Sequence, residues 1–181
     1  RLQWDAMWAQ FLANQATDEA LEKYFESHRR EYDGTEVRVS HILWAVKSAD
    51  DPARLAAAMK EADEVRTRIV AGKITFSEAA QKYSAGPSRR RGGDLGFIPL
   101  HGLMTEAFSR AAFELKPGEV SKPVVDQFGV HLITCTGEKP GERNWRDARR
   151  ELIAALSREK FLDLAALQRK RVEVKIVDGS R

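Results

Sequence analysis

Two histidines occupy positions where the sequence predicts buried strand, and a buried imidazole needs partners for its ring nitrogens. His41 lies between Val39 and Leu43 in one alternating run, and His131 precedes Ile133 in another. An imidazole that is buried without hydrogen bonds costs free energy. For either ring alone, the simpler interpretation is a core histidine bonded to the backbone. Two such rings in one small sheet can also satisfy each other by bonding together, which favours a functional role for the pair.

A glycine-rich segment lies between the two histidines in the chain. Residues 92–96 read Gly-Gly-Asp-Leu-Gly, and consecutive glycines allow positive φ and a close approach of the backbone to other groups. The segment does not open a helix after a strand, which argues against a phosphate cradle or a dinucleotide fingerprint. By itself it is a tight turn before a strand. Between two inward-facing histidines it favours a site.

A metal site is an alternative for the same residues. His41, His131 and Asp94 would supply its ligands, but no further ligand stands at a useful spacing, and the strand faces predict buried imidazoles. Cys135 is the single cysteine, so an intramolecular disulfide and any multi-cysteine metal site are excluded. We therefore expect neither a metal nor a cofactor.

Regular secondary structure must bring the histidines together. Period-two alternation predicts strands over residues 37–44, 120–125 and 130–136. Helical spacing predicts a long helix from Pro52, a short helix capped by Thr75 and Glu78, and another over residues 105–113. The long helix is expected to bury five residues, Leu55, Met59, Ala62, Val65 and Ile69. Strands and helices are mixed without βαβ repetition, which predicts an α+β fold.

Both ends of the chain predict helices with apolar stripes that must pack against something. In the first stretch, helical spacing relates Trp4, Met7, Trp8, Phe11 and Leu12. Thr17 is the expected N-cap of a second helix, and a long C-terminal helix is followed by a closing strand over residues 172–176. The sequence therefore predicts a central domain over residues 35–138, with flanking segments 1–34 and 139–181.

Length and composition limit the function classes. The chain has 181 residues and a net charge of +3, which suits one domain with a smaller lobe and produces no strong field for polyanions. This argues against dedicated nucleic-acid binding. No apolar run approaches the roughly 18 residues that span a bilayer, and no secretory leader is present. Because the sequence begins at Arg1, the earlier removal of an address signal stays open.

Several motifs, taken in order, resemble those of parvulin-type peptidyl-prolyl isomerases. They are Val-Ser-His-Ile-Leu around His41, the run from Phe76 to Ser84, Gly-Gly-Asp-Leu-Gly, Phe108, Pro-Gly-Glu-Val from Pro117, Pro123-Val124 and Phe-Gly-Val-His ending at His131. The resemblance covers about residues 36–137. It implies a four-stranded antiparallel sheet surrounded by helices, and the cis/trans isomerisation of X–Pro bonds. That reaction breaks no bond, so it needs no nucleophile or cofactor.

The resemblance also implies which residues contact a proline. The slot for the proline ring would consist of Leu95, Met104 and Phe108, with Phe128 as a further apolar wall. An apolar slot that excludes water and fits the twisted bond better than either planar form lowers the barrier to rotation.

The remaining site residues lie at the floor and edge of that slot. His41 and His131 would shape and orient the site through their tautomers, without transferring a proton to the substrate. Asp126 matches an edge position at which the family often has Thr; the alternative interpretation is a carboxylate in a turn. Gly86 departs from the family, since many parvulins have Cys or Asp there. Catalysis is then expected to be weak unless Ser84 or Ser88 substitutes.

Arg89, Arg90 and Arg91 form the densest charge run in the chain. The simpler interpretation is a solvated loop. The functional hypothesis places the run beside the slot, where it would favour acidic residues before the proline.

The flanks resemble those of exported bacterial foldases of the SurA and PrsA type. This implies that residues 1–34 and 139–181 are two halves of a mostly helical chaperone lobe. The expected clients are proline-containing unfolded or partly folded polypeptides, and the expected location is the periplasm or cell envelope, with the cytoplasm as the alternative. A membrane anchor outside this chain stays open, as does a homodimer through Trp4 and Trp8. The competing function is a catalytically weak or inactive chaperone or peptide-binding module that keeps the fold.

Overall fold

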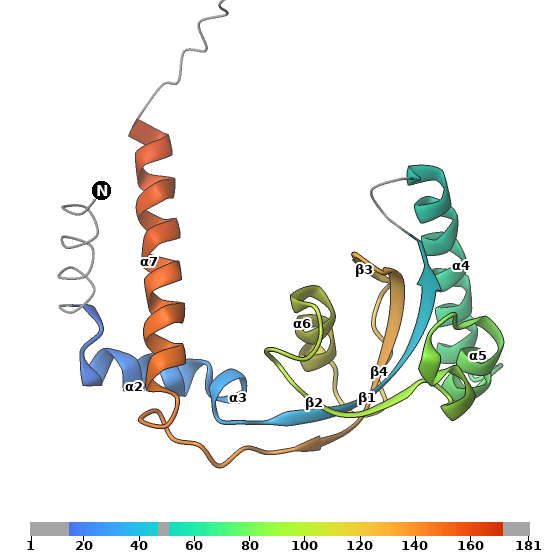
Figure 1. The fold of residues 1–181 in the computed structure, drawn as a ribbon, viewed down its shortest axis with the longest axis horizontal. Helices are drawn as coiled ribbons and strands as arrows, with labels where there is room; N and C mark the ends of the chain where they lie inside the picture. Colours follow the sequence, from blue (N-terminus) through green and yellow to red (C-terminus); the bar gives the residue numbers. More distant parts are fainter. Residues whose placement is uncertain (1–14, 47–50, 172–181) are drawn as a thin grey trace, which may run out of the picture. The chain divides into compact units, whose positions relative to one another are not determined.

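The computed structural model describes residues 15–46 and 51–171 (Figure 1). The chain divides into two compact units, one formed by residues 34–142 and the other by residues 1–33 with 143–181. The predicted stripe from Trp4 to Leu12 and the predicted closing strand over residues 172–176 lie outside the described residues. Each unit is described by itself below.

The unit of residues 34–142 is built on a four-stranded antiparallel sheet with the strand order β2-β1-β4-β3, which confirms the predicted architecture. Its strands are β1 (Glu36–Ala45), β2 (Asp94–Pro99), β3 (Val124–Asp126) and β4 (Gly129–Lys139). β1 lies in the centre, where His41 pairs with Ile133 and Leu43 pairs with His131. Paired residues in an antiparallel ladder share a face. The two histidines are therefore diagonal neighbours on the same face of the sheet.

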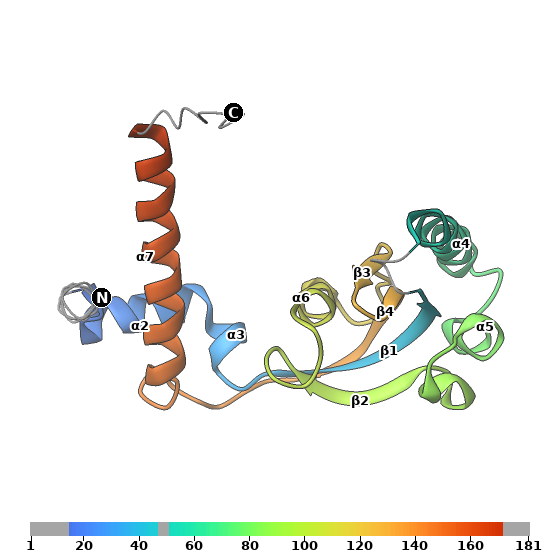
Figure 2. The same cartoon turned by 45° about the horizontal axis from the view of Figure 1, so that its top comes forward.

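Helices cover both faces of this sheet (Figure 2). They are α4 (Pro52–Val70), α5 (Phe76–Tyr83), the short 3-10 helix η1 (Pro87–Arg91) and α6 (Glu106–Glu114). Figure 2 shows α6 on one side of the β1–β4 pair, and α4 and α5 on the other. Val39 and Ile133 pack in one core with Phe108 of α6, whereas Ile42 and Leu132 pack in a second core against α4 and α5.

Local signals account for where these helices begin. The Asp51 carboxylate accepts the Arg54 N–H at 2.9 Å at the start of α4. Thr75 and Glu78 form a complete capping box at the start of α5, which satisfies backbone donors that the first turn leaves free. α6 begins after Thr105, whose hydroxyl accepts the Phe108 N–H at 3.3 Å. That cap is also part of the site described below.

Three details differ from the sequence prediction. Met59 is 40% exposed, because α4 approaches the sheet through the smaller Ala58 and Ala62. The strand predicted over residues 120–125 is regular only in β3, since Pro123 has no N–H for a ladder bond. β4 continues to Lys139, which pairs with Glu36, so the C-terminal flank expected from residue 139 begins within the sheet.

The second unit joins segments from the two ends of the chain. Its described helices are α2 (Asp18–Ser27), α3 (Arg29–Tyr32) and α7 (Arg149–Arg171). Thr17 caps α2 as predicted, accepting the Ala20 N–H at 3.2 Å. The core contains Leu21, Phe25, Tyr32, Trp145, Ala148, Leu152 and Leu156. Among the helices of the described ranges, none is both long enough and apolar enough to cross a bilayer.

Candidate functional site

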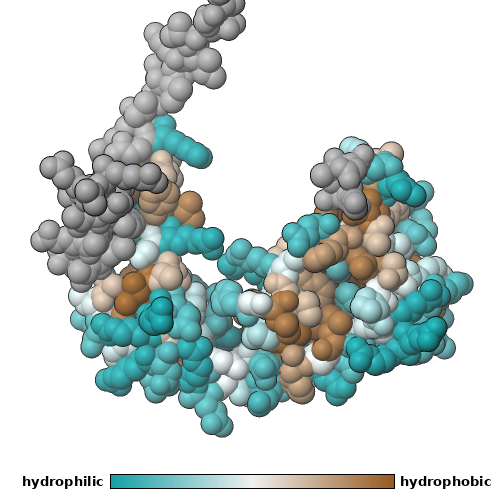
Figure 3. Space-filling view, in the orientation of Figure 1, coloured by the Kyte–Doolittle hydropathy of each residue, from teal (hydrophilic) through white to brown (hydrophobic). Residues whose placement is uncertain are grey.

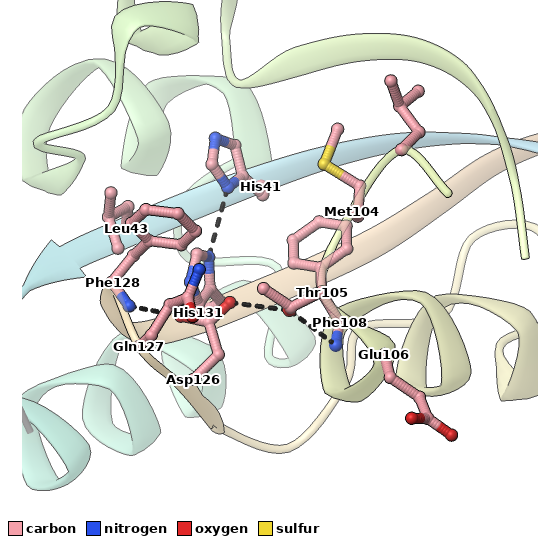
Figure 4. Close-up of a pocket in the computed structure, with 11 residues that line it drawn as sticks. His41, Leu43, Met104, Thr105, Glu106, Phe108, Asp126, Gln127, Phe128 and His131 are labelled. Carbon is pink, nitrogen blue, oxygen red and sulfur yellow. Dashed lines mark hydrogen bonds and ion pairs between the residues drawn. The ribbon is translucent and has the colours of Figure 1, made fainter. Parts of the chain in front are cut away.

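A pocket of about 720 Å³ opens beside the two imidazoles (Figure 4). Three separate segments supply its walls: β1, the stretch that leads into α6 with the first turn of that helix, and the β3–β4 hairpin. The lining residues are His41, Leu43, Leu103, Met104, Thr105, Glu106, Phe108, Asp126, Gln127, Phe128 and His131. The pocket lies entirely within the unit of residues 34–142.

The two imidazoles form the floor of the pocket. Nδ1 of His41 lies 3.3 Å from Nδ1 of His131, and the rings are nearly parallel, with an interplanar angle of 20°. Both side chains are buried, at 8% and 4% exposure. The structure therefore brings together the two histidines that the sequence places on separate strands.

Asp126 holds the far side of this pair. Its carboxylate accepts hydrogen bonds from the Thr105 hydroxyl at 2.8 Å and the Phe128 N–H at 2.8 Å, and its Oδ1 lies 2.9 Å from Nε2 of His131. Burial opposes ionisation of this carboxyl, but the hydrogen bonds from Phe128, Thr105 and His131 outweigh it and lower the pKa of Asp126. Asp126 is therefore an ionised acceptor facing three donors.

The ionised carboxylate determines where the protons of the pair lie. When His131 is neutral, this acceptor-only group requires the His131 proton on Nε2, which leaves Nδ1 of His131 as an acceptor. His41 must then donate through Nδ1, so its own Nε2 carries no proton. Burial first, and the neighbouring charge of His131 second, lower the pKa of His41 from 6.5 to about 4. Near neutral pH the His41 ring is therefore uncharged, and its Nδ1 proton points toward His131.

Nε2 of His41 faces the backbone of Gly86. This nitrogen is buried and has no hydrogen-bond partner within the described ranges. A Cβ atom on residue 86 would stand 3.2 Å from it. The Ser84 hydroxyl accepts the N–H groups of Leu43 and Gly86, each at 3.1 Å, and forms no hydrogen bond with this nitrogen. The Ser88 hydroxyl is also buried without a partner in this part of the chain. The structure thus shows no bond from either serine to His41.

Three of the four apolar residues expected to contact proline line the pocket. Phe108 is 2% exposed and turns the edge of its ring toward both imidazoles, with centroids 5.8 Å from His41 and 5.3 Å from His131. Met104 lies just before α6, and Phe128 is 57% exposed at the mouth. These side chains form an apolar slot over a polar floor.

Leu95 is not among the residues that line this pocket. Val39 pairs with Gly96 while Ser40 pairs with Asp94, so Leu95 is the extra residue of a β-bulge. It packs, partly buried, against the core that contains Phe108. Sequence reasoning also missed five lining residues: Leu43, Leu103, Thr105, Glu106 and Gln127. Leu43 shares the strand parity of His41, and this signal would have indicated it.

The arginine run lies outside the pocket lining. Arg89, Arg90 and Arg91 are exposed on η1. Nε of Arg89 donates to the carbonyl of Gln81 at 2.5 Å, at the end of α5. Asp94, the third residue of the metal hypothesis, bonds to Arg38 at 2.8 Å. Across residues 15–46 and 51–171, no three His, Cys, Asp or Glu side chains are grouped in a way that could hold a metal ion.

A four-stranded antiparallel sheet with two stacked imidazoles under an apolar pocket defines a parvulin-type protein. Comparison with known proteins agrees with this class. The family model described as the rotamase, or PPIC-type PPIASE, domain matches residues 41–137, more than half of the chain. The chain belongs to this PpiC-type peptidyl-prolyl isomerase family.

Among the relatives and solved structures, those named PrsA extend the likeness beyond that domain. The foldase protein PrsA of Bacillus subtilis is 37% identical over 152 residues, covering 84% of this chain and 45% of the relative. The chaperone SurA of Ralstonia nicotianae is 41% identical over 110 residues, 59% of this chain and 21% of that protein. PrsA from Bacillus anthracis superposes with a TM-score of 0.54 at 25% identity, covering 93% of this chain and 71% of the other. TbPIN1 gives 0.51 at 30% identity over 56% of this chain and 97% of its own. The chain thus spans about half the length of the PrsA relative.

Proposed function

We propose that this chain is a peptidyl-prolyl cis/trans isomerase that acts on X–Pro bonds of unfolded or partly folded polypeptides. The observation that carries the proposal is the apolar pocket whose floor is the hydrogen-bonded pair of His41 and His131. No covalent step is needed. The C–N bond rotates slowly only because of its partial double-bond character, with a barrier of roughly 18–20 kcal/mol.

The pocket lowers this barrier by binding the twisted imide. Met104, Phe108 and Phe128 contact the pyrrolidine ring and exclude water from the bond. A twisted imide loses resonance and is less polar than the planar form, so an apolar wall favours it. A preference of about 4 kcal/mol for the twisted state would accelerate exchange roughly a thousandfold.

The imidazole pair supports that slot without exchanging protons with the substrate. The bonds from Asp126 through His131 to His41 hold both rings in place, and the lowered pKa of His41 keeps that ring uncharged near neutral pH. A charged floor would attract water and the planar, more dipolar imide. Asp126 is therefore a positioning residue, and His41 and His131 form the surface on which the proline ring lies.

The helical unit exposes apolar side chains that could bind unfolded client polypeptides. α7 exposes Phe161, Leu162, Leu164 and Leu167, each at least 41% exposed, and Figure 3 shows hydrophobic colouring on this helix. Exposed apolar patches of this kind fit binding to unfolded segments. Following the PrsA and SurA relatives, we assign the flanks 1–34 and 139–181 to a chaperone lobe around an isomerase domain of residues 35–138. The cell envelope is the proposed location.

One assay, applied to a pocket variant and to a control variant, tests this function. Exchange spectroscopy on a short Ala-Pro peptide measures isomerisation, and Met104→Ala should lower kcat/KM by about tenfold, since a lost apolar contact in the bound state changes the barrier by about 1.4 kcal/mol. Leu162→Ala, on α7, is the matched control and should leave the rate unchanged. Absence of exchange at micromolar protein would reject the isomerase.

A second candidate function is a non-catalytic peptide-binding chaperone. It is favoured by Gly86, which offers the rotating carbonyl no side chain, and by the unpartnered Nε2 of His41. Suppression of client aggregation by the full chain, together with no exchange in the peptide assay, would select this function.

A further inference from the structure

Positive charge is concentrated in one stretch of the chain. Residues 65–93 contain seven basic residues and one acidic residue, Glu78, while the whole chain has a net charge of +3. The basic residues are Arg66, Arg68, Lys73, Lys82, Arg89, Arg90 and Arg91. Outside this stretch, acidic residues therefore outnumber basic ones.

The fold gathers four of these cations at the C-terminal end of α5. Arg68 of α4 donates to the Tyr83 hydroxyl at 2.8 Å. The Lys82 ammonium lies 5.2 Å from the centroid of the same ring. Arg89 of η1 reaches back to the carbonyls of Gln81 and Lys82. With Arg90, these exposed residues form what we call the basic surface: Arg68, Lys82, Arg89 and Arg90. The α5 region of Figure 3 is correspondingly hydrophilic.

The groups that hold these cations are uncharged. Arg68 bonds to a phenol, Lys82 lies over an aromatic ring, and Arg89 bonds to peptide carbonyls. None of the four forms an ion pair with an Asp or Glu of the described chain. The dipole at the end of α5 corresponds to roughly half a negative charge at most, which leaves most of the positive charge uncompensated. Arg68 also lowers the pKa of Tyr83, as expected beside a cation.

A shallow cavity of about 490 Å³ lies within the basic surface, lined by Gln81, Arg89 and Arg90. An amide and two guanidinium groups are donors suited to carboxylates. The surface is also tied to the floor of the proline pocket. η1 is preceded by Gly86, which contacts His41, and followed by Gly93, whose carbonyl accepts the His41 N–H at 3.0 Å. One short segment thus connects both sites.

We propose that the basic surface binds an acidic segment, rich in Asp and Glu, of the same polypeptide client whose proline enters the pocket. The inference rests on the proposed function, because it takes the ligand to be a polypeptide. It replaces the expectation that the arginine run reads the residue directly before proline, since none of the three arginines lines the pocket. Four cations around one helix end form a short patch, which fits a few carboxylates better than a long nucleic-acid backbone.

The test compares two labelled peptides that differ only in charge. Both contain one Ala-Pro bond; one carries a block of Glu and the other a block of Gln at the same distance from it. Binding to the full chain is measured by fluorescence anisotropy. The Glu peptide should bind at least about fivefold more tightly at low salt. This difference should disappear near 1 M salt, where the Debye length falls to about 3 Å.

Charge reversal identifies the surface. Lys82→Glu with Arg90→Glu should abolish the preference for Glu. Lys116→Glu with Lys122→Glu makes the same change in charge at exposed lysines elsewhere in the unit and should preserve the preference. Equal binding of both peptides by the unmodified chain, or equal loss in both double variants, would overturn the inference. So would tighter binding of an oligonucleotide or a phosphatidylglycerol vesicle to the same surface.

A separate readout distinguishes this inference from the proposed function. All variants are assayed for exchange of a short uncharged Ala-Pro peptide, which does not reach the basic surface. Preserved exchange with no preference for Glu rejects the basic surface alone. A preference for Glu that depends on Lys82 and Arg90, in a protein without exchange activity, rejects the isomerase and retains the surface.

Discussion

The backbone of Gly86 lies directly against Nε2 of His41, so close that a Cβ atom on residue 86 would stand 3.2 Å from this nitrogen. Asp126, at the opposite end of the imidazole pair, accepts a hydrogen bond from Nε2–H of His131. The acid that orders the pair therefore stands beside His131, and position 86 carries no side chain at all. The absence of a side chain at Gly86 therefore fits the rest of the site, because Nε2 of His41 is buried beside the Gly86 backbone and has no hydrogen-bond partner in the described residues.

The first prediction concerns the space at Gly86. Gly86→Ala should push the His41 ring aside and destabilise the fold by about 1 kcal/mol, because a methyl group overfills a packed site. Backbone strain does not contribute, since Gly86 has φ −77° and ψ 158°, which any residue adopts. Gly86→Ser should recover part of the loss by donating its hydroxyl to Nε2. Urea unfolding measures both variants, and an alanine variant as stable as the unmodified protein would contradict the packing argument.

The second prediction concerns the proton order of the imidazole pair. Nitrogen-15 NMR of the unmodified protein should show a proton on Nε2 of His131 and on Nδ1 of His41. Gly86→Asp combined with Asp126→Thr moves the acid to the other end of the pair, so the protons should move to Nε2 of His41 and Nδ1 of His131. Unchanged ring shifts in the double variant would show that Asp126 does not set the order.

The third prediction is a loss of stability in acid. Because the pKa of His41 falls from 6.5 to about 4 on folding, the unfolded chain binds a proton between these pH values that the folded chain does not. Stability from this group is complete above about pH 6.5 and declines toward pH 4, by up to about 3 kcal/mol. Asp126, with its lowered pKa, adds a loss in the same direction below about pH 4.

Urea unfolding between neutral pH and pH 4 measures this dependence. His41→Gln removes the titrating group and should flatten the curve, whereas His101→Gln, at an exposed position, should leave it steep. Identical curves for both variants would assign the acid sensitivity to other groups.

The fourth prediction concerns Thr105, whose hydroxyl accepts from Phe108 and donates to Asp126. This hydroxyl therefore links the start of α6 to Asp126, which in turn bonds to the imidazole pair. Thr105→Val should cost about 1 kcal/mol of stability through the lost cap and should also alter the imidazole nitrogen shifts. Thr105→Ser retains the hydroxyl and should restore both. If the valine variant loses stability but its imidazole nitrogen shifts are unchanged, Thr105 acts only as the N-cap of α6 and does not position the imidazole pair.

The fifth prediction separates the two units. Replacing Leu164 and Leu167 with Ser reduces the exposed apolar surface of α7, so suppression of client aggregation should weaken while Ala-Pro exchange stays constant. Light scattering of an unfolded client and exchange spectroscopy provide the two readouts. Parallel loss of both activities would show that the surface of α7 does not act separately from the pocket.

Sequence periodicity was sufficient for much of the fold because it reflects local burial. Alternation in β1 and β4 placed His41 and His131 on apolar faces, and the capping box of Thr75 and Glu78 marked the start of α5. Met59 was misjudged because helical spacing identifies an apolar stripe but not how closely the helix approaches the sheet.

The sequence alone determined which strand faces carry the histidines and which segment carries the surplus of positive charge, because both follow from residue order. Tertiary structure decided the rest. The bulge at Leu95 turned that residue out of the slot, and the register of β1 with β4 brought the rings together. Only the folded chain places Asp126 beside His131, Gly86 against His41 and Arg68 near Arg89 through α5. Contacts between residues far apart in the chain depend on register and packing, which residue order does not encode locally.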